Sequence, residues 1–186
     1  MSPEQKLERL KELADQAMSC PDFVKFHDSP SGDPYYRFLF LVAQEFRPKI
    51  MVELGVNFGE GSANLAAGNP DGIVIAVDAR FENLKHEQIG KILNIEMIAG
   101  ETLSAVGQVH QHGAPNLVFF DSDHEEQYVH QEFKAYDPIC ALGAIQIFDD
   151  LNYHGVRPVW EHDVDGLKFE HPGLHGEAGI GIRVKT

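Results

Sequence analysis

Apolar residues recur at intervals of three and four near the start of the chain, and this spacing predicts two amphipathic helices. Ser2 and Gln5 form a capping-box signature at the beginning of the first helix. Asp33-Pro34 opens the second helix, after a predicted loop at 27–34 that contains two prolines and a glycine. The start of the chain is therefore expected to be helical.

From Ile50 onward, short runs that are apolar throughout alternate with helical stretches. Strands of this kind belong to parallel sheets covered by helices on both faces, so we predict an α/β fold with a Rossmann-like, doubly wound and mostly parallel sheet. The last two strands have no crossover helix between them and are expected to pair antiparallel at one sheet edge. The strand candidates are 50–54, 73–78, 95–98, 116–121, 144–148, 167–170 and 179–185. The helix candidates are 62–67, 84–93, 102–109, 125–139 and 156–164.

The change of pattern divides the chain into two parts within a single domain. Residues 1–48 form an N-terminal helical segment, which could act as a cap or lid or could cover a sheet face. Residues 49–186 form the predicted ligand-binding domain. In an open parallel sheet, ligands bind beyond the carboxyl ends of the strands, so the loops that follow the strands are the places to look for chemistry.

The first of these loops, from Glu53 to Ser62, is rich in glycine. Glycines allow positive φ and let backbone amides approach a ligand closely. The next strand ends in Asp78, a carboxylate that could accept both hydroxyls of a ribose. Dinucleotide enzymes use G-x-G-x-x-G. The longer turn E-x-G-x-x-x-G-x-G found here instead resembles the first motif of class I S-adenosylmethionine-dependent methyltransferases.

The resemblance continues in the loop at 99–102, where such methyltransferases hold the adenine, and it extends from about Lys49 to Lys185. It looks closest to metal-dependent small-molecule O-methyltransferases of the catechol and macrocin types and their cephalosporin-hydroxylase-like relatives. The resemblance implies a seven-stranded sheet with an antiparallel last strand, S-adenosylmethionine as cofactor and a small-molecule acceptor. The implied cofactor-binding residues are Glu53, Gly55, Asn57, Phe58, Gly59, Ser62, Asp78, Ala79, Gly100, Glu101, Thr102 and Asp121.

Three aspartates end two strands that are expected to be neighbours. Asp121 follows one strand, and Asp149 and Asp150 follow the next. The ends of neighbouring parallel strands lie about 5 Å apart, so carboxylates there repel one another unless a cation lies between them. Ligands that are all oxygen suit Mg²⁺, Ca²⁺ or Mn²⁺. The other interpretation is that one aspartate caps a helix while another is solvated. We predict a divalent metal site formed by Asp121, Asp149 and Asp150.

His124 lies three residues after Asp121, at an offset where the catechol-type enzymes carry a lysine that deprotonates the substrate hydroxyl. A histidine can serve as a base near neutral pH, or it could cap the next helix. Asp121 and His124 are the candidate catalytic residues, and His154 is a weaker candidate. The tail histidines, His162, His171 and His175, lack metal-ligand spacing with one another and are expected to be exposed. Four aromatic residues could line an acceptor pocket or serve packing: Tyr35, Tyr36, Tyr153 and Trp160.

Composition narrows the choice of partners. The formal net charge of −14 and the scattered basic residues argue against a nucleic-acid partner. No apolar run is long enough to span a bilayer, no signal-like core opens the chain, and two cysteines give no disulfide framework, so we expect a cytoplasmic protein without a membrane partner. Edge strands would allow a homodimer. Two alternatives to a methyltransferase stay open, a nicotinamide-dependent oxidoreductase and a non-catalytic cofactor-binding module.

Overall fold

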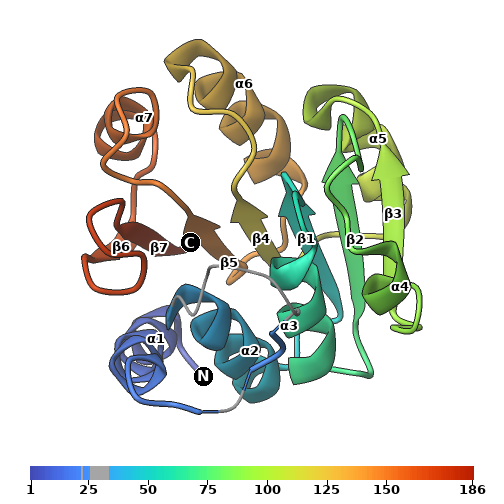
Figure 1. Cartoon of the computed structure of the whole chain (residues 1–186). Helices are drawn as coiled ribbons and strands as arrows, with labels where there is room; N and C mark the ends of the chain where they lie inside the picture. Colours follow the sequence, from blue (N-terminus) through green and yellow to red (C-terminus); the bar gives the residue numbers. More distant parts are fainter. Residues whose placement is uncertain (22, 26–33) are drawn as a thin grey trace.

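The computed structural model describes residues 1–21, 23–25 and 34–186. Its strands form one seven-stranded sheet in the order β3-β2-β1-β4-β5-β7-β6 (Figure 1). β7 pairs antiparallel with both of its neighbours, and the remaining pairs are parallel. The predicted Rossmann-like sheet with an antiparallel last strand is therefore confirmed. The strands are β1 (Ile50–Leu54), β2 (Ile73–Asp78), β3 (Ile95–Ala99), β4 (Leu117–Phe120), β5 (Ile145–Phe148), β6 (Leu167–His171) and β7 (Ile180–Val184).

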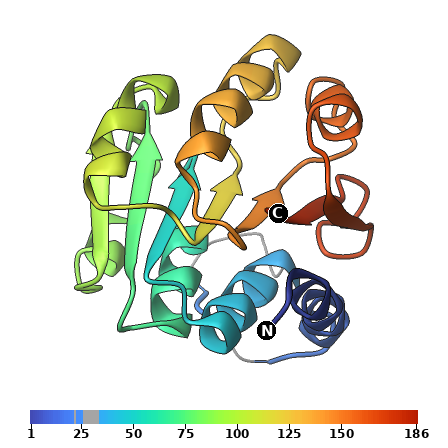
Figure 2. The same ribbon diagram turned by 180° about the vertical axis from the view of Figure 1, so that it is seen from behind.

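Three helices cover one face of this sheet: α1 (Pro3–Ala17), α2 (Pro34–Phe46) and α3 (Glu60–Gly68) (Figures 1 and 2). α1 begins with the predicted capping box, in which the Ser2 amide donates to the Gln5 side chain at 2.9 Å and the Gln5 amide donates to Ser2 Oγ. Leu10 and Phe38, both fully buried, belong to the same apolar core as strands β4, β5 and β7. The N-terminal helices thus pack on the sheet, and a lid role for them stays a prediction.

The opposite face is covered by α5 (Thr102–Gln111), α6 (Glu126–Tyr136) and α7 (Val156–His162), with a short 3-10 turn at Asp137–Ile139 after α6 (Figure 2). Trp160 is 2% exposed in this core, with its ring 5.5 Å from that of Phe148, so it serves packing. Because each face has its own core, the sheet is fixed from both sides and its carboxyl ends form a rigid platform.

The helices α3, α5, α6 and α7 differ from their predicted bounds by up to three residues at an end, and the helix between α3 and α5 differs most. The helix expected at 84–93 is the four-residue α4 (His86–Ile89), because it ends at Gly90. Leu93 is 98% exposed, so it does not hold a longer helix against the core. α3 starts at Glu60, two residues before the predicted start, because its cap is Gly59 with φ +90. The predicted loop at 27–34 lies outside the described residues, apart from Pro34. Among the described helices, none has both the length and the apolar character needed to cross a bilayer.

Candidate functional site

The ends of β1 and β4 lie in close contact at Gly55. This residue has φ +84, a conformation that side chains disfavour, and a Cβ atom at this position would lie 2.0 Å from the carbonyl oxygen of Asp121. Only glycine satisfies both restrictions. The glycine-rich turn therefore brings the backbone after β1 against the backbone after β4, which places the two predicted halves of the site side by side.

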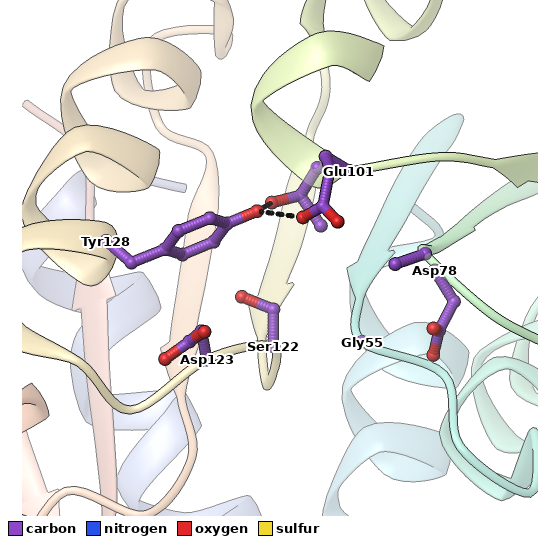
Figure 3. Close-up of a pocket in the computed structure, with 8 residues that line it drawn as sticks. Gly55, Asp78, Glu101, Ser122, Asp123 and Tyr128 are labelled. Atoms are coloured by element: carbon purple, nitrogen blue, oxygen red, sulfur yellow. Dashed lines mark hydrogen bonds between the residues drawn. The ribbon is translucent and has the colours of Figure 1, made fainter.

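A cavity of about 150 Å³ opens beside Gly55 (Figure 3). Three carboxylates line it: Asp78 at the end of β2, Glu101 at the start of α5 and Asp123 in the loop after β4. The eight described lining residues include these three carboxylates and no basic side chain, so the cavity suits hydroxyls and cationic groups better than phosphates. Its lining residues are Gly55, Asp78, Ala79, Glu101, Thr102, Ser122, Asp123 and Tyr128.

Asp78 is held by the glycine-rich turn itself. Its Oδ2 accepts hydrogen bonds from the amides of Val56 at 2.7 Å and Asn57 at 3.2 Å, and its Oδ1 accepts from the amide of Arg80 at 2.9 Å. Asn57 takes the left-handed conformation that such a turn needs, with φ +46. The carboxylate therefore fixes the shape of the turn and still borders the cavity.

Glu53 and Ser62 lie beneath the turn, away from the cavity lining. Glu53 is 2% exposed and accepts hydrogen bonds from the Ser62 hydroxyl and backbone. Its carboxyl packs against Gly61, where a Cβ atom would lie 2.0 Å from Glu53 Oε1. Burial raises the pKa of Glu53 to about 8, with Ser62 opposing the shift. Glu53 therefore supports the glycine-rich turn from beneath.

The predicted adenine loop joins a second buried carboxylate. Thr102 donates a hydrogen bond to Glu132, and Ser122 donates to the same Oε1 atom at 2.7 Å. The hydroxyl of Tyr128 lies 2.8 Å from Thr102 Oγ1 and donates to Glu101 at 3.2 Å (Figure 3). Burial raises the pKa of Glu132 to about 7. Glu132 thus links the loop after β3 to the loop after β4.

The structure brings five of the predicted cofactor residues to the cavity: Gly55, Asp78, Ala79, Glu101 and Thr102. Seven others lie outside its lining: Glu53, Asn57, Phe58, Gly59, Ser62, Gly100 and Asp121. Of these, Phe58 has the Lys85 ammonium 5.4 Å from its ring centroid. Sequence reasoning missed Ser122, Asp123 and Tyr128 as lining residues. The first two lie in the loop that follows β4, so their place after a parallel strand was the available signal.

The three predicted metal aspartates meet at the ends of β4 and β5. Phe120 and Phe148 are register partners, which places Asp121 beside Asp149, and the two side chains share a hydrogen bond. Desolvation, with the nearby Asp149 adding to it, raises the pKa of Asp121 well above its usual range. Desolvation also raises the pKa of Asp149, while His175 opposes that shift. Asp150 has φ +50, a conformation uncommon for a residue other than glycine.

Two histidines complete this group. His124 Nε2 lies 2.7 Å from Asp150 Oδ2, and this contact raises the pKa of His124. His175 Nδ1 lies 2.8 Å from Asp149 Oδ1 and 3.4 Å from Asp150 Oδ1. The prediction that the tail histidines are exposed holds for His162 but is wrong for His175, which is half-buried because the segment between β6 and β7 packs against the loop that follows β5. His171 is also half-buried.

We call Asp121, His124, Asp149, Asp150 and His175 the acid–histidine cluster. Two sets of possible ligand atoms lie within 4.8 Å of one another, one from Asp121, His124 and Asp150, the other from Asp149, Asp150 and His175. Sequence spacing gave no signal for His175, because 25 residues separate it from Asp150. Tyr153 is half exposed, with its ring 5.1 Å from that of His124, whereas Tyr35 is buried.

This arrangement of sheet, turn and acidic strand ends agrees with what known protein families show. The sequence profile described as rhamnosyl O-methyltransferase/CmcI matches residues 38–165, more than half of the chain. The chain belongs to this family. The rhamnosyl O-methyltransferase/CmcI family consists of S-adenosylmethionine-dependent O-methyltransferases, so the predicted class of enzyme is confirmed. No curated protein sequence matches the chain.

Solved structures similar to this member of the CmcI family show the same fold. An O-methyltransferase from Bacillus cereus in complex with SAH is 19% identical, with a TM-score of 0.67 over 98% of this chain and 91% of that one. The O-methyltransferase TomG from Streptomyces achromogenes, in complex with SAM, is 17% identical, with a TM-score of 0.66 over 96% and 90%. MycE, from the mycinamycin biosynthetic pathway, in complex with Mg and SAH, is 17% identical, with a TM-score of 0.56 over 95% of this chain and 54% of MycE.

Proposed function

We propose that this protein transfers the methyl group of S-adenosylmethionine to a hydroxyl of a small molecule, with the help of a divalent metal ion. The observation that carries the proposal is the position of the acidic cavity, which borders the loop after β4 directly beside the acid–histidine cluster. Family membership supports the reaction type. The cavity supports the cofactor, and the cluster supports the metal.

The cavity fits S-adenosylmethionine by its chemistry. The cofactor supplies an electrophilic methyl group on a positively charged sulfur, and it also carries ribose hydroxyls and an ammonium group. Asp78 and Glu101 are hydrogen-bond acceptors for such groups, and we assign Asp78 to the ribose. The loop at Thr102 would hold the adenine. A pyrophosphate would meet three carboxylates here, which disfavours a nicotinamide dinucleotide.

The cluster fits a divalent cation because its carboxylates face one another. Asp121 and Asp149 are desolvated and adjacent, so a positive charge between them would stabilise both ionised groups. We assign Asp121, Asp149 and Asp150 as metal-binding residues. A bound divalent ion would supply a positive charge that orients the acceptor hydroxyl and increases its acidity. Among the solved structures of this fold, that of MycE includes Mg.

We assign His124 as the base that takes the proton of the acceptor hydroxyl at Nδ1, because its Nε2 donates to Asp150. Asp150, 2.7 Å away, holds the ring at the end of β4, and its negative charge favours the imidazolium that results. Positioning the acceptor against the cofactor would supply most of the rate. The charge of −14 favours a small molecule over a nucleic acid as the acceptor.

Calorimetric titration of the protein with S-adenosylmethionine and with its demethylated product tests the cofactor assignment. We expect D78N to weaken binding about 10-fold to 100-fold, since a charged acceptor in a hydrogen bond contributes about 1.5–3 kcal/mol. E82Q, at an exposed carboxylate in the same β2–α4 segment, should bind like the wild type. Equal affinity of D78N and the wild type would refute the ribose assignment.

A screen of small hydroxyl compounds, read by mass spectrometry, tests the reaction. We expect the cofactor to be consumed and the acceptor to gain 14 mass units, about one methylene, in the presence of a divalent ion. Chelation should abolish turnover, and H124A should lower it about 100-fold or more. Cofactor binding without consumption for any acceptor would favour the non-catalytic module. Unchanged turnover after chelation would remove the metal from the proposal.

A further inference from the structure

His175 comes from a part of the chain that the family profile does not reach. The profile ends at residue 165, whereas His175 lies between β6 and β7. Its Nδ1 atom nevertheless lies 2.8 Å from Asp149 Oδ1 and 3.4 Å from Asp150 Oδ1, atoms of the two residues that directly follow β5. The tail thus contributes a nitrogen donor to a group whose other predicted members are all carboxylates.

The segment that carries His175 is fixed on two sides. On one side the amide of Tyr35 donates to the carbonyl of Leu174 at 3.0 Å, and the Tyr35 ring lies 4.6 Å from the imidazole. Leu174 itself is fully buried among the residues of α1 and α2. The imidazole is therefore held against α2 rather than displayed on a loose loop.

On the other side the segment is tied to the residues after β5. The amide of Leu151 donates to the carbonyl of Gly179 at 3.1 Å, and the amide of Asn152 donates to that of Ala178 at 2.8 Å. The His175 carbonyl accepts from the Ala178 amide at 3.0 Å, closing a turn. Since the same loop carries Asp149 and Asp150, the histidine and the aspartates are held in one rigid unit.

We infer that His175 is a ligand of the divalent metal ion, binding through Nδ1, and that it makes the site prefer Mn²⁺, Co²⁺ or Zn²⁺ over Mg²⁺ and Ca²⁺. This inference rests on the metal site of the proposed function. Imidazole suits the first-row transition metals, whereas Mg²⁺ and Ca²⁺ favour sites made of oxygen ligands alone. Three aspartates alone give such an oxygen site, and His175 changes its donor chemistry.

Pulsed electron paramagnetic resonance of Mn²⁺ bound to the full, tag-free chain tests the ligand directly, since a coordinated imidazole adds ¹⁴N modulation to the signal. Because His124 is also close, the measurement is made in H124A, where His175 is the remaining imidazole of the cluster. We expect ¹⁴N modulation in H124A and its loss in the H124A and H175A double variant. Modulation absent from H124A, with Mn²⁺ bound, would overturn the inference and leave the metal site standing.

Metal selectivity gives a second readout that does not depend on activity. Competition between Mn²⁺ and Mg²⁺ should favour Mn²⁺ in the wild type, and H175A should lower that preference about 10-fold or more. H175Q, which replaces the nitrogen donor with an amide of similar reach, should lower it too and serves if H175A fails to fold. H171A is the matched control, since this histidine of β6 pairs with Asp15 instead.

The outcomes separate the inference from the proposal beneath it. An unchanged preference in both His175 variants would overturn the inference alone. Failure of the wild type to bind either ion would overturn the inference and the metal part of the proposed function, and cofactor binding would still be judged by D78N.

Discussion

The cavity and the acid–histidine cluster lie side by side, yet their carboxylates have different partners. On the cavity side, the carboxylate of Asp78 accepts hydrogen bonds from three backbone amides, and Glu53 and Glu132, buried behind the lining, accept hydrogen bonds from hydroxyls. In the cluster, Asp121 and Asp149 face each other, and the charged partners of the group are two histidines. The carboxylates on the cavity side have hydrogen-bond donors as partners, whereas the cluster keeps two desolvated carboxylates side by side, where we propose that a cation binds.

This difference matters for stability as well as for binding. Buried polar groups that have partners cost little, whereas adjacent desolvated carboxylates destabilise the fold until a positive charge arrives. We therefore expect substitutions at the cavity to damage structure and cofactor affinity together. Substitutions that remove a carboxylate from the cluster should raise the stability of the metal-free protein and weaken its metal binding.

The largest effect is expected at Gly55, which forms the contact between the two regions. G55A places a methyl group 2.0 Å from the Asp121 carbonyl at φ +84. Backbone strain and the steric overlap together should lower the free energy of unfolding by about 3 kcal/mol or more. Urea denaturation measures this loss, and calorimetry should show no cofactor binding. A G55A protein with wild-type stability would contradict the close contact of β1 and β4.

The next effect is expected at Glu132, which accepts hydrogen bonds from two residues that line the cavity, Thr102 and Ser122. Its pKa is raised from 4.5 to about 7, so the folded state holds the proton more tightly than the unfolded state. Its contribution to stability is present below pH 4.5 and is lost as the pH rises through about 7. E132Q is uncharged at every pH and keeps the Oε1 acceptor. The free energy of unfolding of the wild type should fall by about 3 kcal/mol across this pH range because of Glu132, and that of E132Q should not.

Urea denaturation at several pH values tests this prediction through the difference between E132Q and the wild type. Other groups titrate in both proteins and cancel in that difference. E126Q, an exposed carboxylate on the same helix α6, is the control and should follow the wild type at every pH. A constant difference between E132Q and the wild type would show that Glu132 titrates near its ordinary value.

In the cluster, D121N is expected to reverse its effect when metal is added. Without metal the variant should become more stable than the wild type as the pH rises and Asp121 ionises, because it removes a desolvated charge and can still hydrogen-bond to Asp149. With metal at about 100 times its Kd, the wild type should gain about 2.7 kcal/mol and the variant little. Thermal unfolding with and without chelator measures both. D123N, at the exposed neighbour, should show no such reversal.

The two regions also differ in how far the sequence predicts them. Gly55 and Asp78 were predicted because neighbouring strands of a parallel sheet bring successive loops together. Asp149 was placed beside Asp121 by the same reasoning. His175 could not be predicted, since its position depends on contacts of the tail with α2 and with the loop after β5. Tyr128 was missed because its role depends on the rotation of α6, which sequence spacing alone does not fix.

The smallest effect, and the one that calibrates the comparison, is expected at Gly107 on the exposed side of α5. A Cβ atom there has no described neighbour within 4 Å, and no unusual φ requires glycine. G107A should therefore raise the free energy of unfolding by about 0.5–1 kcal/mol, because alanine favours the helix and restricts the unfolded chain. Cofactor and metal binding should stay at wild-type levels. Substitution by alanine would then lower the free energy of unfolding at Gly55 and raise it at Gly107. The difference between the two values would measure the cost of placing a side chain at Gly55, in the contact between the cavity and the cluster. A loss of stability in G107A would mean that the change at Gly55 reports a general intolerance of alanine in this half of the molecule, rather than that contact.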